Sequence, residues 1–224
     1  MKKIKVIGAG GIGSILVPLL ARFLDTNKEG AQITIIDGDE YEIKNRSRQL
    51  FDQCGNKAEV TARRLAAEFK NVSFKAQAEY VTNKSILYLL DDEDIIFMCV
   101  DNHKTRKLVS DFCEQELEDV VLFSGGNEFT DGNIQVFARN NGENMGLPIA
   151  NHFHEEIVNP RDKRPDELGC GELVISAPQL IFTNNFIAAL MLNAFYSYFY
   201  QKGCKYNEVY ADIITNNCRA LTRA

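Results

Sequence analysis

The sequence predicts a doubly wound α/β fold, with a mostly parallel, Rossmann-like sheet and an antiparallel extension towards the C-terminus. Two observations predict the parallel sheet. Short apolar runs alternate with helical patterns along the 224 residues, as in parallel sheets covered by helices. A glycine-rich turn at residues 8–13 joins the first apolar run to the first helical pattern. The length suits one sizeable domain, so we expect residues 1–224 to form a single domain.

The elements of the parallel half follow from apolar periodicity. Strands are expected where short runs are apolar and β-branched, and helices where apolar side chains recur at helical spacing. The helix at 57–69 is also favoured by its content of Ala, Arg and Glu. In chain order, the predicted elements are a strand at 4–7, a helix at 14–24, a strand at 32–36, a helix at 57–69, strands at 72–78 and 94–100, a helix at 104–117 and a strand at 120–124.

The antiparallel extension is predicted by a turn and by the pattern that follows it. The Asp131-Gly132 turn favours a hairpin that continues into a strand at 133–139. Residues 140–172 are polar and irregular, so we expect a crossover loop there. The remaining predicted elements are an apolar helix at 177–200 and a last strand at 208–214.

Composition excludes several classes of protein. The formal net charge of -6, without a Lys/Arg cluster, argues against nucleic-acid binding. The apolar segment 180–200 carries Asn184, Asn185 and Asn193, so a buried helix is favoured over a membrane span. The six cysteines include no C-x-x-C pair, and we expect no zinc. The N-terminus lacks a signal-peptide pattern, which predicts a cytoplasmic protein with reduced cysteines.

The glycine turn predicts a nucleotide site. Gly8 permits the tight turn, Gly10 lets the backbone approach a phosphate or sugar, and Gly13 lets the helix pack closely on the strand. The N-terminus of that helix offers unpaired N–H groups to an anion. The alternative is a tight turn that binds nothing. The motif by itself does not identify the nucleotide.

The polar segment after the second strand suggests a triphosphate. Asp37 ends that strand, where a carboxylate can bind ribose hydroxyls, although it could simply cap the next turn. Asn45, Arg48 and Lys57 provide an amide, a fork of donors and a point charge. Singly, each would be an ordinary surface residue. As a set after Asp37, they predict contacts to phosphates.

Asp101 directly follows the apolar strand at 94–100. A carboxylate at such a strand end can hold Mg²⁺, which favours one or two carboxylates together with phosphate oxygens. The alternative is that Asp101 caps the next helix. The two roles are compatible.

These motifs together resemble the ThiF/MoeB adenylyltransferases, a family that includes the nucleotide domains of ubiquitin-activating enzymes. The resemblance spans roughly residues 4–200. Its most specific part is the block N-R-S-R-Q at 45–49 after the D-x-D of Asp37 and Asp39. The other matching features are the glycine motif, Gly55-Asn56-Lys57-Ala58, Asp101-Asn102 with Arg106, and Cys170 with Pro178 before the long helix.

The resemblance implies an activity and a set of site residues. The family joins the C-terminal glycine carboxylate of a ubiquitin-like, β-grasp protein to the α-phosphate of ATP, releasing pyrophosphate. The implied catalytic residues are Arg48, Lys57, Asp101 (also the Mg²⁺ ligand) and Cys170, which in some members takes the acyl group as a thioester. The implied nucleotide-binding residues are Gly8, Gly10, Gly11, Gly13, Asp37, Asp39, Asn45, Arg48, Gln49, Lys57, Asp101 and Asn102.

Three departures from the family pattern shape the expected partners. The chain begins at the first strand, without the N-terminal arm that often lends an arginine to a partner's active site. The paired C-x-x-C zinc ligands are absent, and the loop between Arg48 and Lys57 is short. The chain is similar to compact bacterial members that work beside conjugating-type or peptidase partners. A sulfur-transfer partner is a further possibility.

Two other functions stay open on the sequence. An NAD(P)-dependent oxidoreductase would explain the glycines and Asp37 but would leave Asn45, Arg48 and Lys57 without a role. A non-catalytic scaffold that binds a ubiquitin-like protein is the second alternative. A homodimer is also expected, from the family and from a stripe of Phe182, Phe186, Leu190 and Phe195 along the last helix.

Overall fold

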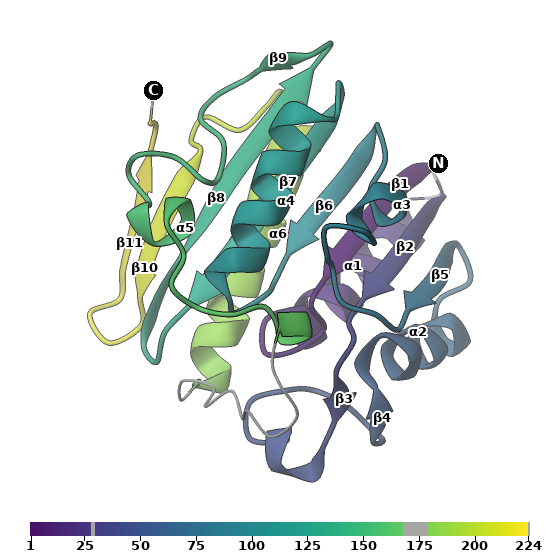
Figure 1. Cartoon of the computed structure of the whole chain (residues 1–224). Helices are drawn as coiled ribbons and strands as arrows, with labels where there is room; N and C mark the ends of the chain where they lie inside the picture. The colour runs from purple at the N-terminus through teal and green to yellow at the C-terminus, as the bar shows by residue number, and fades with distance from the viewer. Residues whose placement is uncertain (28–29, 168–178, 224) are drawn as a thin grey trace.

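The computed structural model describes residues 1–27, 30–167 and 179–223 and confirms the mixed α/β fold with a mostly parallel central sheet (Figure 1). Five adjacent strands are parallel, in the order β5-β2-β1-β6-β7. These are β1 (Lys2–Ile7), β2 (Ala31–Ile36), β5 (Val72–Gln77), β6 (Asp94–Met98) and β7 (Val120–Asn127). This order places the first strand at the centre, between two strands reached by opposite routes.

The antiparallel extension continues the same sheet beyond β7. It consists of β8 (Asp131–Asn140), β10 (Glu208–Asp212) and β11 (Asn217–Leu221), with the short β9 (Glu143–Asn144) paired to β8. The predicted hairpin is therefore confirmed, but its turn lies at residues 128–130, because Asp131 and Gly132 are already the first residues of β8. The last predicted strand ends at Asp212 rather than at residue 214, and β11 was not predicted from the sequence.

Helices cover both faces of the sheet (Figure 1). One face packs against α1 (Gly13–Thr26), α2 (Lys57–Glu68) and α6 (Ile181–Tyr200). The other face packs against α3 (Ile86–Leu89), α4 (His103–Gln115) and α5 (Glu155–Val158). Strand side chains alternate between the two cores. Phe97 belongs to the first core, whereas its neighbours Ile96 and Met98 belong to the second.

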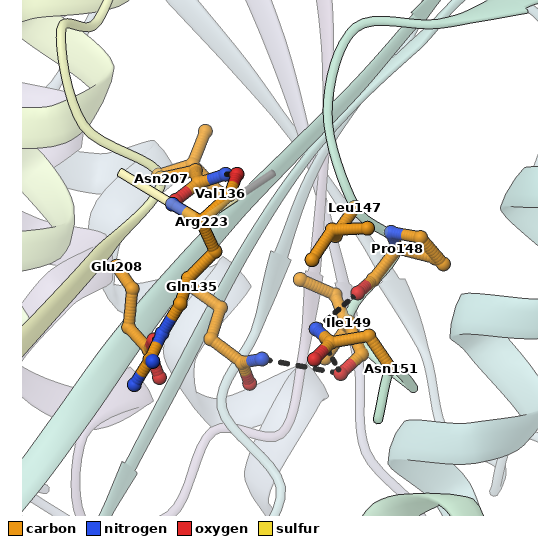
Figure 2. Close-up of a pocket in the computed structure, with 9 residues that line it drawn as sticks. All are labelled: Gln135, Val136, Leu147, Pro148, Ile149, Asn151, Asn207, Glu208 and Arg223. Atoms are coloured by element: carbon orange, nitrogen blue, oxygen red, sulfur yellow. Dashed lines mark hydrogen bonds and ion pairs between the residues drawn. The ribbon is translucent and has the colours of Figure 1, made fainter. Parts of the chain in front are cut away.

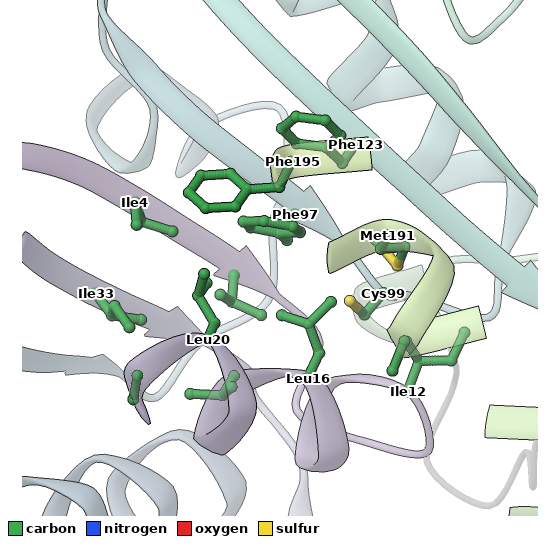
Figure 3. Packing of buried hydrophobic residues seen from close by; sticks show 14 of the residues in the cluster. Ile4, Ile12, Leu16, Leu20, Ile33, Phe97, Cys99, Phe123, Met191 and Phe195 are labelled. Atoms are coloured by element: carbon green, nitrogen blue, oxygen red, sulfur yellow. The ribbon is translucent and has the colours of Figure 1, made fainter. Parts of the chain in front are cut away.

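The core under α1 and α6 is built largely from aromatic and branched side chains (Figure 3). Phe195 of α6 lies 5.7 Å from Phe97 and 6.1 Å from Phe123, measured between ring centroids. Its exposure is 1%, whereas Phe182 is 68% exposed. The stripe expected to form a dimer surface is thus divided, because Phe195 is a core residue. No helix within the described residues is both long and apolar enough to cross a membrane.

The topology creates one crevice at the carboxyl ends of the parallel strands. The chain leaves β1 for α1 on one face, while it leaves β6 for α4 on the other face. Since β1 and β6 are neighbours in the sheet, their following turns separate and leave an opening between them. Two further segments border this opening. They are the β3–β4 pair (Glu40–Tyr41 with Gly55–Asn56) and the segment 145–167.

Candidate nucleotide-binding cleft

A cleft of about 1180 Å³ occupies this opening. Eleven of the twelve residues predicted to bind a nucleotide line it, and Gly13 is the exception. The lining residues from that prediction are Gly8, Gly10, Gly11, Asp37, Asp39, Asn45, Arg48, Gln49, Lys57, Asp101 and Asn102. Residues distant in the sequence are therefore brought to one place. Cys170 lies outside the described residues.

Glycine is favoured at each of the three motif positions for a different physical reason. Gly8 has a φ of +90°, and a Cβ on it would lie 2.9 Å from the main-chain oxygen of Cys99. A Cβ on Gly13 would lie only 2.0 Å from the main-chain oxygen of Gly8, so this glycine is needed for packing. A Cβ on Gly10 would find its nearest atom at 3.5 Å, on Gln49. Gly10 is thus open towards the cleft, as its predicted role requires.

Asp37 orders the glycine turn from the end of β2. Its Oδ2 accepts a hydrogen bond from the Ala9 N–H at 2.6 Å, and its Oδ1 accepts one from the Asp39 N–H at 2.9 Å. The second bond is the turn-capping role considered above. Burial raises the pKa of the Asp37 carboxyl, against the lowering effect of Lys57. Each carboxylate oxygen has a further lone pair that can accept a hydrogen bond from a ribose hydroxyl.

Lys57 is held by Asp39. Its Nζ lies 2.9 Å from Asp39 Oδ2, and its exposure is only 7%. The Tyr80 hydroxyl donates a hydrogen bond to Asp39 Oδ1 at 2.5 Å. Burial alone would raise the pKa of Asp39, but Lys57 and Tyr80 outweigh it and keep the pKa below its usual value. The sequence did not identify Tyr80, which also lines the cleft.

Asn45 shapes the turn that presents Arg48. Its side-chain Oδ1 accepts a hydrogen bond from the Glu42 N–H at 3.0 Å, and its main-chain oxygen accepts from the Arg48 and Gln49 N–H groups. Asn45 is buried, whereas Arg48 is partly exposed in the cleft wall. The Tyr41 hydroxyl, which donates to the Ala9 main-chain oxygen at 2.6 Å, ties this segment to the glycine turn.

Two roles were considered for Asp101 at the end of β6, as a cap of the next helix and as a ligand of Mg²⁺. Asn102 caps α4, because its Oδ1 accepts from the Thr105 N–H at 2.8 Å. The alternative that Asp101 is the cap is therefore wrong. Asp101 is exposed, lines the cleft and has no hydrogen-bond partner among the described residues. A cleft carboxylate without such a partner fits the chemistry of Mg²⁺, which binds one or two carboxylates and takes its other ligands from phosphate and water.

Clusters of metal-binding side chains are not found in the described part of the chain. No group of three or more His, Cys, Asp and Glu side chains is arranged there to hold a metal ion. Arg106, which belongs to the resemblance, has a structural role. Its guanidinium donates to Ser124 Oγ at 2.7 Å and to the main-chain oxygens of Val100 (2.5 Å) and Gly125 (2.7 Å). It therefore links the ends of β6 and β7.

The segment 145–167 borders the cleft on the side of α4. The Asp162 carboxylate accepts from the N–H groups of His103 (2.5 Å) and Lys104 (3.1 Å), at the N-terminus of α4. Lys104 also pairs with Glu167 at 2.8 Å. A carboxylate at a helix N-terminus is favourable because unpaired N–H groups and the helix dipole meet there. The expected crossover segment is thus anchored beside Asp101.

His154, which lines the cleft, belongs to a group of bonded polar side chains that the sequence did not indicate. His154 Nε2 lies 2.6 Å from Glu208 Oε1, and Arg223 Nε lies 2.7 Å from Glu208 Oε2. Glu208 and Arg223 border a small cavity with Gln135, whose Nε2 donates to the main-chain oxygen of Ile149 (Figure 2). Although burial would raise the pKa of Glu208, Arg223 and His154 hold it below its usual value. These contacts join β8, β10 and the segment 145–167.

Comparison with known proteins gives one family and a set of partial relatives. The ThiF family profile matches residues 1–218. The adenylyltransferase and sulfurtransferase MOCS3 of Drosophila ananassae is 27% identical over 141 residues, which are 61% of this chain and 30% of the fly protein. The tRNA threonylcarbamoyladenosine dehydratase of Haemophilus influenzae is 29% identical over 132 residues, 56% of this chain and 48% of that protein. The chain thus spans less than half of these curated relatives.

The fold is shared with a solved adenine-nucleotide complex. The crystal structure of E. coli MccB with ATP matches with a TM-score of 0.73 and 18% identity. The match covers 99% of this chain and 63% of the MccB chain. At this identity the likeness concerns the fold alone.

Proposed function

The chain belongs to the ThiF family, and we propose that it is an ATP-dependent adenylyltransferase that activates the C-terminal carboxylate of a partner protein. One observation chiefly supports the proposal. The open glycine Gly10, the donor-rich Arg48 segment and the carboxylate of Asp101 face one cleft. A dinucleotide oxidoreductase has no evident use for Arg48 and Asp101 in this arrangement.

In the proposed reaction, this chain supplies orientation and charge. Asp37 binds ribose hydroxyls, and the glycine turn with the N-terminus of α1 approaches the phosphates. A carboxylate oxygen of the acceptor attacks the α-phosphorus of ATP, and the bond to the pyrophosphate oxygen breaks. The products are an acyl-adenylate and pyrophosphate. Arg48 and Lys57 stabilise the negative charge that develops on the phosphates. Mg²⁺, held by Asp101, would neutralise further phosphate charge.

The acceptor in this proposal is a ubiquitin-like, β-grasp protein. The support is the family and the names of the relatives, since MOCS3 is an adenylyltransferase and sulfurtransferase. A conjugating-type or sulfur-transfer protein would then receive the activated acyl group. The Haemophilus relative is a dehydratase that acts on a modified tRNA nucleoside. This chain's net charge of -6 does not favour an RNA substrate.

Two measurements, made one after the other, test the proposed function. Thermal unfolding with ATP and with NADH identifies the nucleotide, because a ligand at about 100 times its Kd adds about 2.7 kcal/mol to the free energy of unfolding. ATP–pyrophosphate exchange is then measured with ubiquitin-like proteins that end in a free glycine carboxylate. Versions with an amidated C-terminus are the control. Stabilisation by NADH and not by ATP would contradict adenylation. ATP binding without exchange, on any acceptor, would favour a scaffold.

The first mutational prediction concerns Asp101. We expect Asp101→Ala to abolish pyrophosphate exchange and to leave the unfolding midpoint unchanged, because the side chain is exposed and Asn102 already caps α4. Exchange is measured over a range of Mg²⁺ concentrations. Asp111→Ala, at a partly exposed ion pair on the same helix, is the control. Full exchange in Asp101→Ala would remove this residue from the reaction.

A second prediction concerns Cys170, which we propose as an acceptor of the acyl group. Adenylation needs no thiol, so Cys170→Ala is expected to keep pyrophosphate exchange. It should lose any covalent adduct with the acceptor that a thiol reagent cleaves. Non-reducing gels with and without added thiol measure the adduct. If the wild-type protein forms no such adduct with an acceptor that supports exchange, the reaction ends at the adenylate.

A third prediction is a homodimer. Phe182 and Tyr196 are exposed on the outer side of α6, at 68% and 43%. Burying such aromatic surface between two copies would be favourable. Light scattering at micromolar concentration is expected to give twice the chain mass, and Phe182→Asp to give a monomer. A monomer mass for the wild type would contradict the expectation.

A further inference from the structure

Asn184 is a buried amide that joins separate parts of the cleft wall. It lies in the first turn of α6, and its exposure is 0%. Its Nδ2 donates a hydrogen bond to the main-chain oxygen of Arg48 at 3.0 Å. The same nitrogen lies 2.5 Å from the point where a Cβ on Gly11 would stand. One side chain therefore connects α6, the glycine turn and the Arg48 segment.

The buried face of α6 is otherwise apolar except for Thr183. Thr183 Oγ1 donates to the main-chain oxygen of Phe129 at 2.7 Å. Phe129 and Arg48 both line the cleft, on segments far apart in the sequence. Both buried polar residues of the helix thus bind a carbonyl of the cleft wall. The first turn of α6 fixes two sides of the site, whereas the rest of the helix fills the core.

Asn184 is not fully paired. Its Oδ1, like Oε1 of the buried Gln49, has no hydrogen-bond partner within residues 1–27, 30–167 and 179–223. Gln49 Nε2 lies 3.5 Å from the Cβ position of Gly10, so the two amides lie beside the two adjacent glycines. An unpaired buried acceptor destabilises a fold, and an apolar residue of similar size would avoid that cost. This favours a role at the cleft over one in stability.

We propose that Asn184 is a positioning residue for Arg48. By binding the main-chain oxygen of Arg48, it holds the backbone from which that guanidinium extends towards the phosphates of a nucleotide on the glycine turn. Asn184 acts through Arg48 and does not touch the nucleotide. The inference rests on the proposed function, because it requires Arg48 to bind phosphate.

The test is a double-mutant cycle read by calorimetric titration with ATP and with adenosine, which lacks phosphates. Asn184→Ala is expected to weaken ATP binding about tenfold, the effect of a well-placed contact worth about 1.4 kcal/mol, and to leave adenosine binding within about twofold. In an Arg48→Ala background, Asn184→Ala should cause no further loss, since residues that act as one unit are not additive. Asn185→Ala, at the exposed neighbouring position, is the control and should bind both ligands normally.

Several results would overturn the inference. Equal losses of ATP and adenosine binding would indicate a structural role, and additive losses in the double variant would show that Asn184 acts independently of Arg48. If Asn184→Ala unfolds at the titration temperature, Asn184→Leu, which fills a similar space without a donor, replaces it in the same cycle with the same expected results. A wild-type protein that does not bind ATP overturns the proposed function and this inference together. Normal ATP binding by Asn184→Ala, with a clear loss in Arg48→Ala, overturns the inference alone.

Discussion

Replacing Arg48 with lysine is expected to lower the rate of ATP–pyrophosphate exchange by about 10²–10³-fold, the usual loss when one preorganised donor to a developing charge is removed. The charge is kept, but a lysine ammonium does not reproduce the planar fork that binds two phosphate oxygens. Exchange is measured at saturating ATP, so that weaker ATP binding does not contribute to the loss of rate.

A neighbouring arginine provides the control for this substitution. Arg46 lies on the same segment but is exposed, lies over the Phe51 ring at 5.6 Å and does not line the cleft. Arg46→Lys should exchange at the wild-type rate. If Arg48→Lys did the same, Arg48 would be a surface residue and the proposed phosphate site would lose its main support.

Gly13→Ala is expected to lower the stability of the fold, whereas Gly10→Ala is expected to prevent ATP binding. A Cβ on Gly13 would lie 2.0 Å from the main-chain oxygen of Gly8, so α1 would have to move away from β1. Overpacking of this kind typically costs about 1–3 kcal/mol. A Cβ on Gly10 meets nothing closer than 3.5 Å, so the fold should tolerate it. It would, however, occupy the space through which a phosphate approaches the backbone.

Urea unfolding and ATP titration separate these two outcomes. Gly13→Ala should lower the urea midpoint. Gly10→Ala should keep the wild-type midpoint and lose ATP binding. Wild-type ATP affinity in Gly10→Ala would indicate that the turn does not contact the nucleotide.

The parallel half of the fold was predictable because its strands are continuous apolar runs between clear turns. Every residue of β6 is buried, and the sequence there is apolar from residue 95 to 98. β11 was not predictable, since four of its five residues are exposed and no apolar alternation marks it. α3 and α5 have four residues each, too few for a helical period to show.

The candidate site also contains residues that could be predicted from the sequence and residues that could not. Asp37, Asn45, Arg48 and Lys57 could be recognised because they follow one another along 21 residues of chain. Tyr80 and Asn184 could not, because their place at the cleft depends on how distant segments fold together. The direct partner of Lys57 could not be predicted from the sequence either. The sequence predicts that this lysine binds phosphate, and the structure places its Nζ against Asp39.

The bonds made by Arg106 carry a consequence for sequence variation. Its guanidinium spans the ends of β6 and β7, and a Cβ on Gly126 would lie 2.7 Å from Arg106 Nη2. A larger residue at 126 is therefore compatible only with a shorter one at 106. These two positions are expected to change together among relatives. Since main-chain oxygens that follow β6 and lie in β7 bind the same side chain, a substitution at either position is expected to change the edge of the cleft that these two strands form.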